Sequence, residues 1–156
     1  MQAGTVTDAP TIRQILVPVD GSEHAKSAAQ TAIRLGSSYK AKLIIISVVV
    51  PPGFFISGPV GAPADLTDYF QLEMEEANGA VKAIATLAKE AGVEARSTVL
   101  RPPGSVAEAI VDFASSERVD LIVVGTRGLG GFKKLLLGSV SSGVIANAPC
   151  SVLVVR

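Results

Sequence analysis

The sequence has few of the residues that build disulfide frameworks, aromatic cores or strongly charged surfaces. Its 156 residues include one cysteine, no tryptophan, two tyrosines and five phenylalanines. A single cysteine excludes an internal disulfide and a multi-cysteine metal site, and it suits a reducing cytoplasm. The 14 basic residues match the 14 acidic ones. Because the chain has a net charge of zero, nucleic acid is a poor candidate for its partner.

Long hydrophobic runs are missing as well. No apolar run reaches the roughly 18 residues that a membrane span needs, so we expect no membrane association. The opening residues MQAGTVTDAPT lack a basic segment followed by an apolar one, which argues against a signal peptide. We therefore expect residues 1–11 to form a flexible tail and residues 12–156 to form one cytoplasmic domain with an aliphatic core.

Short β-branched runs alternate with helical patterns along the chain. The runs are residues 14–20, 42–50, 93–100, 119–125 and 150–156. The helical patterns cover residues 22–39, about 66–91, 105–117 and about 139–147. This alternation predicts an α/β fold, a parallel sheet with helices on both faces. The run at 93–100 alternates in polarity, which favours a strand nearer the sheet edge, whereas the other four are apolar almost throughout.

The segment GTRGLGGFKKLLLGSVSSG, residues 125–143, follows the run at 119–125. Glycines let a ligand approach the bare backbone, and the amides at a helix start attract anions. Hydroxyl donors and charge for a polyphosphate could come from Ser139, Ser141, Arg127, Lys133 and Lys134. The alternative is an ordinary flexible connection with solvated basic residues. Neither GxxxxGK[ST] nor GxGxxG occurs here, so the two common phosphate loops are excluded.

The spacing Gly125-x2-Gly128-x9-Gly138-Ser139 resembles the G-x2-G-x9-G-[ST] ATP-binding signature of the universal stress protein family. The resemblance runs from about Ile12 to Arg156 and includes VPVDGS, RPPGSVAEAIVDFA and GSVSSGVIANAPCSVLVVR. Ser151 departs from it, because many members have proline there. The resemblance implies an open five-stranded sheet of order 3-2-1-4-5 and membership of the nucleotide-binding branch.

The same resemblance implies a set of nucleotide-binding residues. Asp20 would accept from a ribose hydroxyl or hold a metal through water, although a turn or capping role is the alternative. Val49 would line the adenine slot, unless it is an ordinary strand residue. The full set is Pro18, Val19, Asp20, Val49, Gly125, Arg127, Gly128, Gly138, Ser139, Val140 and Ser141.

Three other features are open to a functional or a purely structural interpretation. His24 is the only histidine, and with no partner named by the sequence we expect an exposed helix residue. Cys150 has no activating neighbour, so we expect it to be packed and inert. The loop 51–63, with Phe54 and Phe55, is a lid, a docking surface or a simple connection.

These observations predict a cytoplasmic ATP-binding universal stress protein that acts as a nucleotide-dependent regulator or sensor. Mg²⁺ or Mn²⁺ would bridge the phosphates. The resemblance implies a homodimer formed by pairing of the last strands, and a regulator needs a further protein partner. The alternatives are a slow ATPase or phosphotransferase, a nucleotide-free interaction module, and a slot for cyclic AMP or another adenosine compound. Gly128→Val is predicted to block phosphate approach without unfolding the chain.

Overall fold

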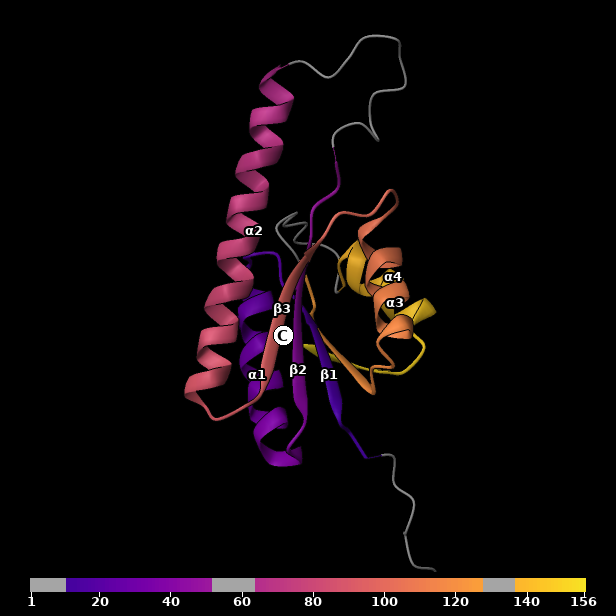
Figure 1. The fold of residues 1–156 in the computed structure, drawn as a ribbon. Coiled ribbons are helices and arrows are strands. Elements are labelled where there is room, and N and C mark those ends of the chain that lie inside the picture. Colours follow the sequence, from indigo (N-terminus) through magenta and orange to yellow (C-terminus); the bar gives the residue numbers. More distant parts are fainter. Residues whose placement is uncertain (1–10, 52–63, 128–136) are drawn as a thin grey trace, which may run out of the picture.

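The computed structural model describes residues 11–51, 64–127 and 137–156, and Figure 1 shows their arrangement. The predicted tail, most of the loop 51–63 and the basic part of the glycine-rich segment lie outside these ranges. The described elements alternate between strand and helix. In chain order they are β1 (Gln14–Pro18), α1 (Glu23–Tyr39), β2 (Lys42–Val48), α2 (Ala64–Glu90), β3 (Ala95–Leu100), α3 (Val106–Ser116), β4 (Leu121–Gly125), α4 (Ser139–Asn147) and β5 (Ser151–Val155).

The strands form one parallel sheet of order β3-β2-β1-β4-β5, as the family resemblance implied. The alternating strand β3 lies at one edge, as predicted, and β5 lies at the other. The inner strands β1, β2 and β4 have almost completely buried side chains. Their continuous apolar composition follows from being covered on both faces.

Two apolar cores separate the sheet from its two helical layers. One packs Ile15, Leu43 and Val123 against α1 and α2, and the other packs Leu16, Ile44 and α3 with α4 on the opposite face. Successive side chains of a strand point to opposite faces, so alternate residues of the same strand serve different cores. Figure 1 shows α1 and α2 on one side of the sheet and α3 and α4 on the other.

Strands β1 and β2 end two residues earlier than their β-branched runs predicted. The ladder continues for one more hydrogen bond in each case, from Val19 N to Ile46 O at 2.8 Å and from Val49 N to Leu100 O at 2.9 Å. The chain then turns, with Gly21 at a φ of +82°. A run of strand-forming residues therefore overestimates the strand, because the turn residues decide where pairing stops.

Helix α2 is much longer than the strands that it covers. At about 1.5 Å per residue its 27 residues span roughly 40 Å, whereas a strand of six residues spans roughly 20 Å. Its amino-terminal half therefore extends past the carboxyl edge of the sheet (Figure 1). In the described ranges, no helix combines the length and the apolar character needed to cross a membrane.

Candidate functional site

A cleft opens at the carboxyl edge of the sheet between β1 and β4. This is where the winding reverses, since β2 and β3 lie on one side of β1 and β4 lies on the other. Ligands of open α/β sheets bind at such a point. The cleft has a volume of about 100 Å³. Seven of the predicted residues line it: Pro18, Val19, Asp20, Gly125, Arg127, Val140 and Ser141.

Pro18 explains why the sheet parts at this point. The β1–β4 register covers only Ile15 with Leu121 and Leu16 with Ile122. Val19 donates its amide to β2, and successive amides of a strand point to opposite neighbours. The missing N–H of Pro18 therefore lies on the β4 side, where proline cannot donate a ladder bond. The proline at position 18 thus helps to open the cleft, because it cannot donate a hydrogen bond to β4.

The structure does not bring every predicted residue to the cleft. Gly138 and Ser139 begin α4 beside it, Val49 lines a separate cavity, and Gly128 lies outside the described ranges, as do Lys133 and Lys134.

Val48, rather than Val49, faces the cleft. Val48 packs with the α3/α4 core, whereas Val49 is 6% exposed on the other face. A shift of one residue along a strand moves a side chain to the opposite face. Four further residues that line the cleft were not predicted from the sequence: Ala25, Val106, Ile110 and Val124. Their ordinary helix and strand patterns gave no signal beyond core packing.

Asp20 has the turn role that was the alternative to ligand binding, and it also lines the cleft. Its Oδ1 accepts a hydrogen bond from Ser22 N at 2.9 Å, and Ser22 Oγ in turn caps α1 by accepting from Ala25 N. The Asp20 side chain is exposed. The same contact that shapes the turn therefore fixes where this carboxylate stands at the cleft.

The start of α4 is uncapped, unlike those of α1 and α3. Ser22 and Ser105 cap α1 and α3 with their side chains, and each of these helices has a glutamate in its first turn. Helix α4 begins at Gly138 with no side-chain cap and no acidic residue in its first turn. In the described ranges, no acceptor takes the amides of Ser139 and Val140. Such amides, at the positive end of the helix dipole, attract an anion.

Two hydrogen bonds fix α4 to the end of β4. Ser141 Oγ donates to Gly125 O at 2.6 Å, and Gly138 N donates to Thr126 O at 2.7 Å. The Ser141 hydroxyl was predicted to be a donor to phosphate, but it donates its proton inside the protein. The Ser141 hydroxyl is therefore used within the protein, and the donors left for a ligand include the backbone amides at the start of α4 and the guanidinium of Arg127.

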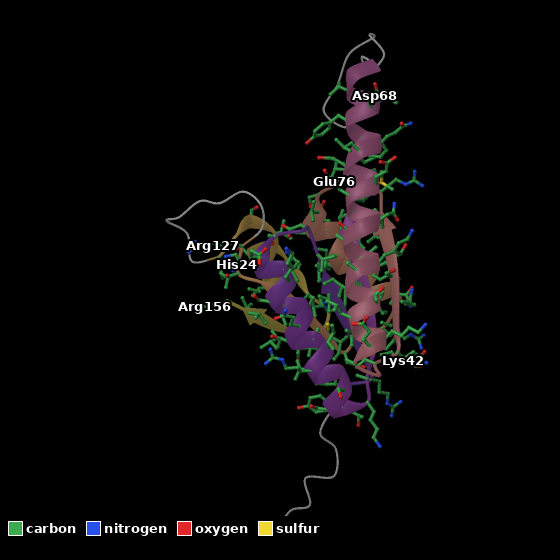
Figure 2. All side chains as sticks on the ribbon, turned by 90° about the vertical axis from the view of Figure 1, so that its left-hand side faces the viewer. His24, Lys42, Asp68, Glu76, Arg127 and Arg156 are labelled. Carbon is green, nitrogen blue, oxygen red and sulfur yellow. The ribbon has the colours of Figure 1, made fainter. Side chains whose placement is uncertain are left out.

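Gly125 has a packing reason that does not involve a ligand. A Cβ on it would come within 2.8 Å of the carbonyl carbon and oxygen of His24, in the first turn of α1. His24 itself differs from its prediction, because it is half-buried and its Nδ1 lies 3.3 Å from Thr126 Oγ1. In the view of Figure 2, His24 and Arg127 are labelled on the same side of the molecule.

The sequence also matches the model of the universal stress protein family over residues 11–156. The chain belongs to the universal stress protein family. It is 39% identical over 145 residues to universal stress protein MJ0531 of Methanocaldococcus jannaschii, covering 92% of this chain and 82% of that one.

Solved structures of the family share this fold. Universal stress protein UspA from Lactobacillus plantarum superposes with a TM-score of 0.82 at 27% identity, covering 95% of this chain and all of that one. A universal stress protein solved in complex with cAMP superposes with a TM-score of 0.66 at 26% identity, covering 94% and 98% of the two chains.

Two charged side chains, Asp20 and Arg127, stand among the described lining of this universal stress protein's cleft. Where the structure describes the chain, no three His, Cys, Asp or Glu residues gather as a metal site. Mg²⁺ commonly uses one or two carboxylates and completes its shell with substrate phosphates and water. One carboxylate therefore fits a metal that arrives with a phosphate ligand, and does not fit a resident ion.

Cys150 lies just before β5, at the amino edge of the sheet and away from the cleft. Burial, followed by the charge of Asp120, raises the pKa of its thiol. The thiolate is the reactive form, so a raised pKa keeps this residue unreactive at neutral pH. Cys150 is partly buried against the α3/α4 core, as expected for a packed cysteine, and its inertness stays a prediction.

Proposed function

We propose that this protein binds an adenine nucleotide in the β1–β4 cleft and acts as a nucleotide-dependent cytoplasmic regulator. The uncapped start of α4, with Arg127 beside it, carries the proposal, because both offer positive charge to phosphate at the same edge of the sheet. The relative solved with cAMP supports an adenosine compound as the ligand.

Each part of the cleft has a role in this proposal. The amides of Ser139 and Val140 and the guanidinium of Arg127 would hold phosphate oxygens. Asp20 would accept from the ribose or hold a water of Mg²⁺ or Mn²⁺, and Val48 would contact the base. The motif glycines Gly125, Gly128 and Gly138 would keep the backbone accessible there.

The volume of the cleft suggests how binding acts on the protein. Ligand pockets typically measure about 300–1,000 Å³, whereas the described residues enclose about 100 Å³. Binding would therefore widen the cleft and change the surface around it. A partner that contacts this edge would then distinguish the two states, and the nucleotide would shift the equilibrium by its differential affinity.

Thermal unfolding with ATP, ADP, AMP, cyclic AMP and GTP, with and without Mg²⁺, tests the proposal. A ligand at about 100 times its Kd stabilises the fold by about 2.7 kcal/mol. For a chain of this length that corresponds to a rise in Tm of roughly 5–11 °C. We expect adenine compounds to raise Tm and GTP to have a much smaller effect. The phosphate series identifies the physiological ligand class, and the arms without Mg²⁺ test the metal.

Arg127→Gln with a matched control locates the binding site. A charge-assisted hydrogen bond contributes about 1.5–3 kcal/mol, so the variant should weaken ATP binding by about tenfold or more. Arg34→Gln removes an exposed arginine of α1 and should leave affinity unchanged. No rise in Tm with any adenine compound, or equal losses in both variants, would contradict the proposal. A single-turnover assay separates regulation from slow hydrolysis.

We also propose that β5 pairs with β5 of a second copy. Within the described ranges this strand has a neighbouring strand on one side only, and Leu153 on it is 37% exposed. An uncovered apolar edge strand is a template for pairing with another chain. Val140 and Ile145 on the adjacent α4 are also exposed.

A further inference from the structure

A second cavity lies on the opposite face of the sheet from the nucleotide cleft. It has a volume of about 530 Å³ and lies between the amino-terminal half of α2 and the ends of β1 and β2. This volume falls within the range of small-molecule sites, about 300–1,000 Å³. Among the described lining residues, only Asp20 and Val48 are shared by both cavities.

The cavity exists because α2 is longer than the sheet. The part of α2 that packs on strands buries Val81, Ile84 and Ala88. Among the described residues, the helix covers no strand beyond the carboxyl edge of the sheet, and its inward side lines the cavity there. The walls there are mainly apolar and include Val49, Val50, Phe70, Ala77 and Ala80.

One buried polar group points into this space. Ser47 is 5% exposed and lines the cavity. Its side chain lies on the same face of β2 as Leu43 and Ile45, which pack beneath α1 and α2. In the described ranges the Ser47 hydroxyl has no hydrogen-bond partner. Every fully buried side-chain N or O atom in those ranges has a partner, so the Ser47 oxygen is not fully enclosed. The hydroxyl therefore opens into the cavity, and buried hydroxyls are normally hydrogen-bonded.

The charge at the cavity is negative. Glu73 and Glu76 line it from α2, and neither forms a salt bridge with a described residue. A hydrogen bond to Glu73 is the largest cause of the raised pKa of Tyr69 at the mouth. No lysine, arginine or histidine is among the described lining residues. Figure 2 shows Glu76 on the part of α2 that rises beyond the start of α1.

We propose that this cavity binds a small organic cation with an apolar or aromatic body. The body would fill the space between Val49, Phe70 and Ala80, and the Ser47 hydroxyl would hydrogen-bond to a polar atom of the ligand. The cationic end would face Glu73 and Glu76. Anionic ligands would be excluded by these two carboxylates and by that of Asp20, which also lines the cavity, so charge sets the selectivity of the site.

Three probes of the same shape and different charge test this assignment. The ¹⁵N-labelled full chain is titrated with 4-phenylbutylamine, 4-phenylbutanol and 4-phenylbutyrate and followed by amide chemical shifts. We expect the amine to bind best, at least about tenfold better than the carboxylate. The shifts should gather at Ser47, Val49, Ala77 and Ala80, and the amide of Ser141 in the nucleotide cleft should not move.

Charge and volume variants complete the test. Glu73→Gln with Glu76→Gln should reduce the preference for the amine by about tenfold or more, leaving only the part due to Asp20, whereas Glu75→Gln, on the exposed side of the same helix, should preserve it. Ala80→Phe fills the cavity and should remove binding of all three probes. Equal binding of amine and carboxylate, shifts outside the cavity, or full binding to Ala80→Phe would overturn the proposal.

Discussion

Replacing Gly125 by alanine tests whether this motif glycine serves packing. The new Cβ would lie 2.8 Å from the carbonyl carbon and oxygen of His24 and 2.9 Å from its Cβ. The clash is largely with backbone in the first turn of α1, so no rotamer change relieves it. Overpacking of this kind costs about 1–3 kcal/mol. For a chain of this length we expect Tm to fall by roughly 2–12 °C, measured by calorimetry without nucleotide.

Gly79→Ala is the matched control, with the same chemical change in a different environment. Gly79 lies inside α2, and a Cβ there would meet no atom within 4 Å. Alanine favours the helix over glycine by about 0.5–1 kcal/mol, so Tm should rise by roughly 1–4 °C. If Gly125→Ala were as stable as the wild type, the packing argument would fail. Loss of nucleotide binding at unchanged Tm would assign this glycine to the ligand.

Two further predictions concern the cap of α3 and the edge of the sheet. Hydrogen bonds from the backbone and hydroxyl of Ser105 lower the pKa of Glu108 below its ordinary value of 4.5. Because folding lowers this pKa, the ionised Glu108 carboxylate stabilises the folded protein fully above pH 4.5. This stabilisation is lost as the pH falls through the folded-state pKa. The stability difference between wild type and Ser105→Ala, from urea midpoints, should therefore be larger at pH 7 than at pH 3, and a pH-independent difference would refute this. Leu153→Lys should convert the proposed dimer to a monomer in light scattering, whereas Leu72→Lys, on the exposed side of α2, should not. A monomeric wild type or a dimeric Leu153→Lys would rule out pairing through β5.

Local sequence patterns were sufficient for the elements, whereas the residues of the proposed cleft came from the resemblance to the family. The alternation of β-branched runs with helical stripes predicted all five strands and four helices of the described ranges. Ser22, the first residue of the helical pattern at 22–39, caps α1 in the structure. These features depend on residues close together in the chain, so local physics decides them. The strand order came only from the resemblance to the family.

Contacts between distant residues could not be predicted. No residue near Gly125 in the sequence indicates that the backbone of His24 packs against it. The hydrogen bond from the Ser141 hydroxyl to the Gly125 carbonyl is equally absent from the local pattern. The choice of Val48 over Val49 depends on the register of β2 against its neighbours. One residue of register exchanges the two faces, and a run of three valines leaves that choice open.

The amino-acid sequence by itself determined the α/β class, the chain order of the elements and the glycine and serine positions that mark the family. These follow from periodicity, capping and turn chemistry within a few residues. The tertiary structure decided which side chains face the cleft, which serine is committed to internal bonding, and that a second cavity exists under α2. That cavity arises from a mismatch in length between a helix and the sheet beneath it, which becomes visible only when the two are packed together.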